Sequence, residues 1–145
     1  MLRKIISGGQ TGADMAGLLA AKELGLKTGG CAPRDYNTEE GPNLELKTLY
    51  GLVAKGSYYQ RTYNNVRDSD ATVIFGKLAS SGSRLTSRYC TVWKKPFITN
   101  PNMGDLLAFL EEHRIETLNV AGNRETKNPG IEQRVRAFLV EALSC

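Results

Sequence analysis

The sequence predicts an α/β fold, a single Rossmann-like domain in which helices sandwich a mainly parallel sheet of about five strands. Three observations support this prediction. The 145-residue chain suits one ordinary domain, which we place over residues 1–145. Apolar runs suited to buried parallel strands alternate with stretches of helical periodicity. The first run leads into a glycine-rich turn and a helix, as in phosphate-binding loops.

The predicted strands and helices alternate along the chain. The strands are Lys4–Ser7, Thr28–Ala32, Ala71–Phe75, Pro96–Thr99 and Thr117–Ala121. The helices are Ala13–Leu24, Tyr59–Arg67, Leu85–Trp93, Gly104–His113 and Gly130–Leu143. Small residues in the first helix allow it to lie close to the sheet, and an apolar stripe in the last helix predicts core packing.

Residues 33–57 interrupt this alternation. The segment has no convincing period and contains turn signals at Gly41-Pro42, Gly51 and Gly56. Connections of this length in a small domain are usually functional or disordered. Its apolar residues are too numerous for simple disorder: Tyr36, Leu44, Leu46, Leu49, Tyr50 and Leu52. We expect a lid over a site or a contact between two copies of the chain.

The composition limits the binding partners and the cellular location that we expect for this protein. The chain has 19 basic and 15 acidic residues, a net charge of +4, without a concentrated basic patch. We therefore expect no nucleic acid partner. No apolar run approaches the ~20 residues that span a bilayer, so no membrane partner is expected. Residues 1–4 lead directly into the glycine turn without room for a signal peptide, which predicts a cytoplasmic protein.

The inventory for catalysis is small. Cys31, Cys90 and Cys145 show no CxxC spacing and are expected to be reduced thiols, and no metal site is expected. His113, the only histidine, is expected in solvent at a helix end, so no Ser-His-Asp or Cys-His set can form. Whether the protein is an enzyme stays open. Any catalysis would depend on carboxylates, with Arg61 as their partner: Asp14, Glu39, Glu40 or Glu125.

The glycine turn, KIISGGQTGAD over residues 4–14, is the first candidate binding site. Its glycines allow a sharp turn, and the free N–H groups at the helix start favour an anion. The candidate phosphate-binding residues are Gly8, Gly9, Gln10, Thr11, Gly12 and Asp14. No Gly-Lys-Ser/Thr follows, which excludes a P-loop, whereas Ser7, Gly9 and Gly12 approximate the dinucleotide fingerprint with Asp35 as the ribose-binding acid. The alternative is a tight turn without a ligand.

A second candidate lies within residues 58–86. Arg61 and Asn65 share a helix face, with Thr62 beside them. The following serine/glycine turn supplies hydroxyls and backbone donors from Ser81, Gly82, Ser83 and Thr86. We expect the two anion-binding turns to lie on neighbouring strand ends. The alternative is a solvated helix face.

A third candidate is VAGNRETKNPG, residues 120–130. A strand again ends in glycine, and Arg124 follows among Asn123, Glu125 and Lys127. Ligands of open α/β sheets bind outside the carboxyl ends of the strands, so Arg124 joins the predicted phosphate-binding residues. The alternative is an exposed basic loop.

Together these motifs, SGGQTGAD, GGCAP, EEG, RTYNNVRDSDATVIF, SSGSRLT and AGNRETKNPG, resemble the circularly permuted YpsA-type branch of the SLOG superfamily. The resemblance implies a Rossmann-like sheet whose usual first strand, the one before AGNRE, has moved to the C-terminal end. Members are described as molybdenum-cofactor carriers, which implies a molybdopterin-type cofactor or a nucleotide as the ligand.

The resemblance extends to the Lonely-Guy and lysine-decarboxylase-like proteins, whose second loop reads PGGxGTxxE. These proteins have an arginine-bearing helix and an Ala-Asp dipeptide before that loop, and the counterparts here look like Arg61, Ser69-Asp70-Ala71 and the turn over residues 80–86. Arg88 falls roughly where the hydrolase glutamate would be, so the resemblance does not support hydrolysis by that carboxylate.

The leading hypothesis is a cytoplasmic binding protein for a phosphorylated nucleotide-type ligand, a molybdenum-cofactor carrier, which forms a homodimer. One alternative is a nucleotide or N-glycosidic phosphoribohydrolase-like enzyme in which Asp14 or Glu125 polarises water. Another is a sensor whose long loop changes shape when it captures a ligand. We expect bulky β-branched residues at Gly9 and Gly12 to abolish ligand binding and leave the fold intact.

Overall fold

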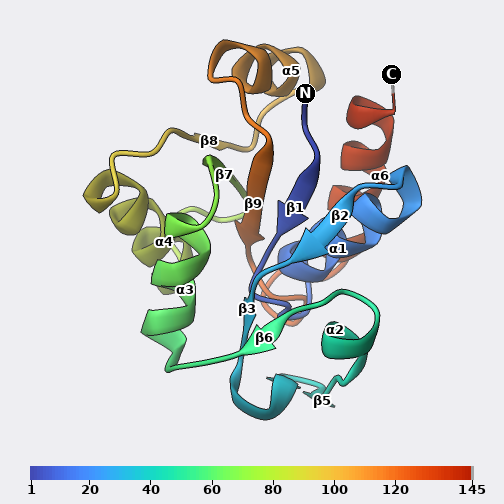
Figure 1. Cartoon of the computed structure of the whole chain (residues 1–145), viewed down its shortest axis with the longest axis vertical. Coiled ribbons are helices and arrows are strands. Elements are labelled where there is room, and N and C mark those ends of the chain that lie inside the picture. The colour runs from blue at the N-terminus through green and yellow to red at the C-terminus, as the bar shows by residue number, and fades with distance from the viewer. Residues whose placement is uncertain (145) are drawn as a thin grey trace.

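A computed structural model describes residues 1–144 and has a five-stranded parallel sheet at its centre (Figure 1). The strands are β1 (Lys4–Ile6), β2 (Lys27–Gly29), β7 (Ala71–Phe75), β8 (Phe97–Thr99) and β9 (Thr117–Gly122). Their order is β2-β1-β9-β7-β8, and every neighbouring pair is parallel. This sheet confirms the predicted α/β, Rossmann-like fold. β9, the last strand in the sequence, lies in the middle.

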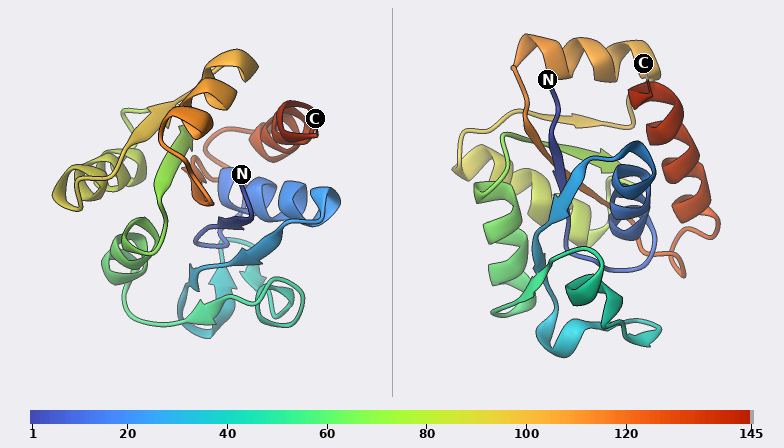
Figure 2. Two further views of the ribbon diagram at one scale, coloured as in Figure 1. Left: turned by 45° about the horizontal axis from the view of Figure 1, so that its top comes forward. Right: turned by 45° about the vertical axis from the view of Figure 1, so that its right-hand side comes forward.

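Helices cover both faces of the sheet (Figure 2). One face carries α1 (Ala13–Leu24), α5 (Met103–Glu112) and α6 (Ile131–Leu143), and the other carries α3 (Tyr58–Arg67) and α4 (Ser81–Val92). The main core lies on the first face, where side chains of α1, α5 and α6 pack against β7 and β9. α1 approaches closely because Gly17 lies against Val120, where an ideal Cβ would be 2.7 Å from that side chain. The small residues of the first helix therefore act as predicted.

Two predicted boundaries are wrong for local reasons. α4 begins at Ser81, four residues before the predicted Leu85, because the Ser80 hydroxyl caps it by accepting a hydrogen bond from Ser83 N at 3.2 Å. The predicted strand Thr28–Ala32 divides at Gly30 into β2 and β3 (Cys31–Ala32). Gly30 has φ 127°, and a Cβ there would lie 2.2 Å from Ser7 O. The chain turns where only glycine fits.

Residues 33–57 form a folded lobe. They contain a 3₁₀ turn at Arg34–Tyr36, β4 (Asn37–Thr38), β5 (Gly41–Pro42), α2 (Glu45–Thr48) and β6 (Val53–Ala54). β6 pairs with β3, and β4 pairs with β5. Leu46, Tyr50 and Leu52 are buried in a second core cluster against Leu18 and Ala32. Their burial explains why the segment is apolar without a regular period.

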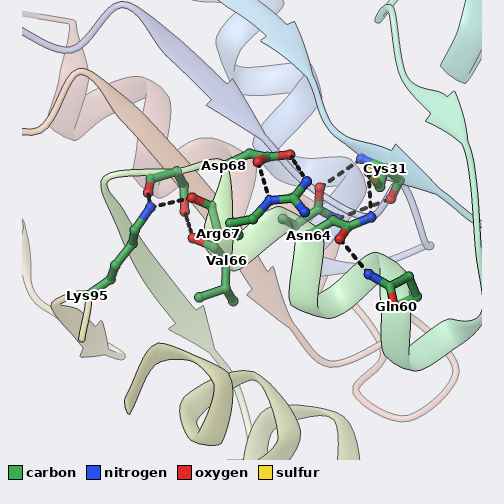
Figure 3. A network of polar contacts seen from close by, with 9 residues as sticks. Cys31, Gln60, Asn64, Val66, Arg67, Asp68 and Lys95 are labelled. Carbon is green, nitrogen blue, oxygen red and sulfur yellow. Dashed lines mark hydrogen bonds and ion pairs between the residues drawn. The ribbon is translucent and has the colours of Figure 1, made fainter. Parts of the chain in front are cut away.

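Polar contacts attach α3 to its neighbours in the fold. The Lys95 ammonium donates to the carbonyl of Arg67, as Figure 3 shows, and to that of Ser69 at 2.5 Å, so it caps the C-terminal end of the helix. On the other side of the helix, Asn64 Nδ2 donates to the Cys31 sulfur at 3.8 Å. α3 is therefore attached both to β3 and to the chain before β8.

The remaining expectations concern thiols, the histidine and the membrane. Cys31 is half-buried and Cys90 buried, both as free thiols, whereas Cys145 lies outside the described residues. His113 is exposed at the end of α5, with its ring 4.9 Å from that of Phe109. Within residues 1–144, none of the helices combines the length and the apolarity that crossing a bilayer requires.

Candidate functional site

A cavity of about 720 Å³ opens at the carboxyl edge of the sheet. β1 leads through α1 to β2 on one side, whereas β7 leads through α4 to β8 on the other, so the chain leaves the sheet centre in opposite directions. This is the topological switch point at which open α/β sheets bind ligands. The cavity is lined by Gly8, Gln10, Asp14, Tyr58, Arg61, Thr62, Asn65, Lys77, Ala79, Ser80, Ser81, Gly82, Thr86, Asn119, Val120, Ala121, Gly122, Asn123, Arg124 and Lys127.

The predicted site residues divide between the cavity and its supports. Those that line it are Gly8, Gln10, Asp14, Arg61, Thr62, Asn65, Ser81, Gly82, Thr86 and Arg124. Gly9, Thr11, Gly12 and Ser83 do not line it. The glycine and serine turns are also not on neighbouring strands, because β9 lies between β1 and β7. Both turns nevertheless border the same cavity.

Gly8 lies where three polar side chains converge. An ideal Cβ at this position would lie 2.9 Å from Asp14 Oδ2, 3.5 Å from an Arg61 nitrogen and 3.8 Å from Asn65 Nδ2. Arg61 also donates to Gly8 O at 3.4 Å. Because Gly8 has no side chain, one small ligand group can contact the Asp14 carboxylate, the Arg61 guanidinium and the cavity wall at the same time.

Gly9 and Gly12 serve the fold instead. Both have positive φ, 75° and 85°. A Cβ on Gly9 would lie 2.9 Å from side-chain atoms of Leu46 and Leu52, and one on Gly12 would lie 2.3 Å from Asn123 O. The expectation that β-branched residues at these positions would leave the fold intact is therefore wrong, because they would clash with buried packing and backbone.

Thr11 and Gln10 tie the turn to its surroundings. The Thr11 hydroxyl donates to Glu39 of the lobe and accepts from Glu125 N at 3.3 Å. Gln10 Oε1 accepts from Thr11 N at 3.1 Å and from Glu39 N at 2.9 Å. Burial opposes ionisation of Glu39, but hydrogen bonds from Thr11 and Thr126 outweigh it and lower its pKa. Glu39 of the lobe thus supports the glycine turn. Residues 33–57 do not line the cavity and so form no lid over it in this structure, whereas the alternative, a contact between two copies of the chain, stays a prediction.

Asp14 and Arg61 set the electrostatics of the interior. Burial raises the pKa of Asp14 to about 6, although Arg61 and the backbone N–H groups of Gln10 and Gly8 oppose the shift. Arg61 is 8% exposed, and its guanidinium carbon lies 4.9 Å from the centre of the Tyr58 ring. Burial also lowers the pKa of Arg61, and the Asp14 carboxylate opposes that shift. The Arg61 cation and the Asp14 carboxylate are thus held close together where little water reaches them.

The other predicted residues of α3 have protein partners. The Thr62 hydroxyl donates to Tyr58 O at 3.0 Å, one turn earlier. Asn65 Oδ1 accepts from Cys31 N at 2.7 Å, and its Nδ2 donates to Cys31 O at 3.1 Å. Asn65 therefore holds β3 against α3 while one side of it borders the cavity.

The serine turn presents the start of α4 to the cavity. Ser81 and Gly82 line it. No residue from Ser80 to Ser83 has a positive φ, so serines can occupy positions that are glycines in the PGGxGTxxE loop. An ideal Cβ on Gly82 would lie 2.9 Å from the Tyr58 hydroxyl. Tyr58 therefore bridges the mouth from α3 to α4. Thr86 Oγ1 donates to Gly82 O at 2.9 Å, and the buried Ser83 hydroxyl has no partner within residues 1–144.

Asn123 organises the loop after β9. Its Oδ1 accepts from Lys77 N at 2.6 Å, and its Nδ2 donates to Lys77 O at 3.1 Å and to Ser80 Oγ at 3.3 Å. It is 4% exposed, so these bonds are shielded from water. Asn123 therefore joins the turn after β7 to the end of β9 and sets the width of the cavity there.

The other carboxylates considered for chemistry do not face the cavity. Glu125 accepts from Gly130 N at 2.6 Å and from Glu132 N at 3.1 Å, so it caps the start of α6, and these bonds lower its pKa. Asp35, predicted as a ribose-binding acid, is exposed in the lobe with φ 56°. Glu39 is bound to Thr11 and Thr126. Among residues 1–144, Asp14 is the carboxylate that lines the cavity.

The structure adds residues that the sequence analysis did not assign to the site. Lys77 and Lys127 stand at the rim with Arg124, Tyr58 covers one side, and Asn119 lies inside. Lys77 and Lys127 each follow a buried strand and its glycine, which is a detectable signal. Asn119 is a polar residue within an otherwise apolar strand, and that departure from the pattern was the signal for it.

The charge of the cavity favours an anion. Its lining contains the basic residues Arg61, Lys77, Arg124 and Lys127, against a single carboxylate. Backbone N–H groups at the start of α4 add to this potential. Within residues 1–144, no group of three His, Cys, Asp or Glu side chains is placed to hold a metal ion.

Comparisons with known proteins agree with this architecture. The family model described as the circularly permutated YpsA SLOG family matches residues 5–143. A crystal structure at 1.45 Å of a protein named "putative molybdenum carrier protein", from Syntrophus aciditrophicus SB, is 33% identical. That similarity covers 99% of this chain and 96% of the other, with a TM-score of 0.85. No curated protein matches the sequence. The chain therefore belongs to the circularly permuted YpsA family of SLOG proteins.

Proposed function

We propose that this protein binds a small phosphorylated, nucleotide-type ligand in the cavity at the switch point, as a carrier of the molybdenum-cofactor type. The observation that carries the proposal is the convergence of four basic side chains and the start of α4 on one cavity. Such a cavity suits a phosphate group, because charge-assisted hydrogen bonds from guanidinium and backbone N–H groups are strong there.

Burial distinguishes the roles of the basic residues. Arg61 is 8% exposed inside the cavity, so its charge is weakly screened and lies next to Gly8. Lys77, Arg124 and Lys127 are exposed at the rim. In the proposal Arg61 anchors the phosphate, and the rim residues attract the anion and hold its outer oxygens.

The size of the cavity supports a ligand larger than phosphate. A volume of about 720 Å³ lies within the range of small-molecule sites. The similarity to the protein named "putative molybdenum carrier protein" covers 99% of this chain. Both observations support a nucleotide or a molybdopterin-type cofactor as cargo; the cytoplasmic location stays a prediction from the sequence. The predicted homodimer stays a prediction, to which the exposed Leu44 and Leu49 of the lobe lend an apolar surface.

Replacing Arg61 tests the proposal. We expect Arg61→Met to weaken binding of a phosphorylated probe by roughly 10- to 100-fold, because one buried charge-assisted hydrogen bond is lost. Inorganic phosphate and nucleoside monophosphates are the probes, measured by calorimetry and by the ligand-induced rise in melting temperature. Mass spectrometry of the natively purified protein would identify a retained ligand directly.

Arg88→Met is the matched control, because Arg88 is exposed on α4 and does not line the cavity. Arg124→Met, at the rim, should weaken binding by only about threefold, because its charge is exposed and screened. The melting temperature of ligand-free Arg61→Met shows whether that variant is folded. If Arg61→Met and Arg88→Met bind the probes equally well, or if no phosphorylated probe binds the unaltered protein, the proposal is wrong.

One observation favours the hydrolase alternative enough to keep it. Asp14 lines the cavity beside Arg61, and its pKa of about 6 suits a group that exchanges protons near neutral pH. An N-glycosidic hydrolase would place Asp14 against a water and Arg61 on the phosphate. Product analysis with nucleoside monophosphates decides the matter, since turnover that disappears in Asp14→Asn would favour the enzyme and no turnover above background would reject it.

A further inference from the structure

The cavity extends inward from the anion site along β9. Its lining includes Asn119, Val120 and Ala121, which precede Gly122 at the strand end. A strand rises by about 3.3 Å per residue, so Asn119 lies about 10 Å behind the turn that follows β9. A single phosphate ion held by Arg61 is smaller than this distance, which leaves room in the cavity for the body of the ligand.

Asn119 is an unusual residue for this place. It lies on the central strand and is 3% exposed, and its register partners are Ile6 on β1 and Thr72 on β7. Parallel strands covered on both faces are normally apolar, because a buried amide without partners costs free energy. Leu118 and Val120, its neighbours on β9, obey that rule with 0% exposure.

The amide of Asn119 is only partly used by the protein. Its Nδ2 donates one hydrogen bond, to Thr72 Oγ1 at 3.2 Å. Within residues 1–144, Thr72 is the hydrogen-bond partner found for this amide, and Asn119 Oδ1 is not among the fully enclosed polar atoms that lack a partner, so it is open to the cavity. The side chain therefore offers one acceptor and one donor side by side at the floor of the cavity.

We infer that Asn119 binds the edge of a planar nitrogen heterocycle that belongs to the phosphorylated ligand. An amide that offers one donor and one acceptor pairs with a ring edge that offers the reverse, as asparagine does with adenine. Purine and pterin rings both have such edges. This inference rests on the proposed function, since the phosphate held by Arg61 positions the ring over Asn119.

The test compares phosphorylated compounds with and without a ring. The probes are ribose 5-phosphate, the nucleoside monophosphates AMP, GMP, CMP and UMP, and a phosphorylated pterin, each titrated by calorimetry. We expect at least one ring compound to bind roughly tenfold or more tightly than ribose 5-phosphate, because a site built for ring hydrogen bonds is left unpaired by the sugar phosphate.

Asn119→Leu should then remove the preference for the ring. Leucine has a similar volume and suits the buried strand, so the variant is expected to fold and to bind ribose 5-phosphate within about twofold of the unaltered protein. Thr72→Val is the matched control, because it removes the protein partner of Asn119 and leaves the amide. We expect it to keep most of the ring preference, whereas a purely structural amide would make the two variants alike.

Three outcomes would overturn the inference. The ring compounds and ribose 5-phosphate bind equally well, Asn119→Leu keeps the ring preference, or Asn119→Leu and Thr72→Val lose it to the same extent. In each case ribose 5-phosphate still binds and the proposed function stands. Failure of every phosphorylated probe to bind the unaltered protein is a separate result, which rejects the proposed function and this inference with it.

Discussion

The two faces of the central sheet differ in packing, and β9 belongs to both. On one face Leu118 and Val120 are fully buried in the core with α1, α5 and α6. On the other face, which α3 and α4 cover, Asn119 and Ala121 line a cavity, which Val120 also borders although it belongs to the core cluster. Alternation along a strand turns successive side chains to opposite faces. A single strand thus stabilises the fold with one set of residues and opens a site with the other.

The glycines also fall into two groups, those that lie against packed atoms and those that lie beside the cavity. A Cβ at Gly12 would meet backbone at 2.3 Å, and one at Gly17 would meet Val120 at 2.7 Å. A Cβ at Gly8 or Gly82 would instead meet the end of a side chain, Asp14 or Tyr58. One sequence motif therefore contains glycines required by packing and glycines that keep a cavity open. Mutations should separate the two kinds.

The largest expected effect comes from Gly12→Val. Its Cβ would overlap Asn123 O in a backbone conformation that valine avoids, so we expect the free energy of unfolding to fall by more than about 3 kcal/mol. Urea denaturation followed by circular dichroism measures the change. Gly25→Val is the matched control, since Gly25 has φ 74° and no atom within 4 Å of an ideal Cβ. It should cost much less, and equal losses would contradict the assignment of Gly12 to packing.

For Asp14, on the cavity face, we expect the opposite effect, because replacing it should stabilise the protein. Burial raises its pKa from 3.8 to about 6, so between these values the folded state holds a proton that the unfolded state has lost. Stability contributed by Asp14 therefore falls as the pH rises through this window, and the cost is complete above it.

We expect Asp14→Asn to increase the free energy of unfolding at pH 8 by about 1 to 2 kcal/mol, because a half-buried negative charge is removed. The gain should vanish below pH 4. Urea denaturation at pH 4, 6 and 8 measures it. A variant that is less stable than the unaltered protein at pH 8 would show that Asp14 supports the fold, as a residue of the packed face would.

The fold was predictable because its signals are local. The buried strand Ala71–Phe75 and the helix Ala13–Leu24 match the sequence prediction to the residue, since continuous apolar runs and small-residue periodicity depend on neighbours in the chain. The lobe was not predictable in this way. Leu46 and Leu52 are buried by contact with α1 and Gly9, which is a tertiary cause without a periodic signal.

The site was predictable in part. Arg61 and Asp14 reach the cavity because a helix face and a helix start place them there. Glu125 was misassigned, since its bonds to Gly130 N and Glu132 N depend on how the loop before α6 folds back. Asn119 was overlooked because strand periodicity treats it as a defect, whereas the topology makes it the floor of a cavity.

The smallest predicted effect concerns how α3 is held on the cavity face. Lys95 donates to the carbonyls of Arg67 and Ser69 at the end of the helix, so Lys95→Met should cost about 1 kcal/mol or less. Hydrogen exchange should accelerate in α3 and remain unchanged in α1, which the main core buries. Lys94→Met, an exposed neighbour without this role, is the control. Because Arg61 lies on α3, faster exchange there only in the Lys95 variant would show that the helix that carries Arg61 depends on this cap. Equal acceleration in α1 would mean instead that the two faces unfold as one unit.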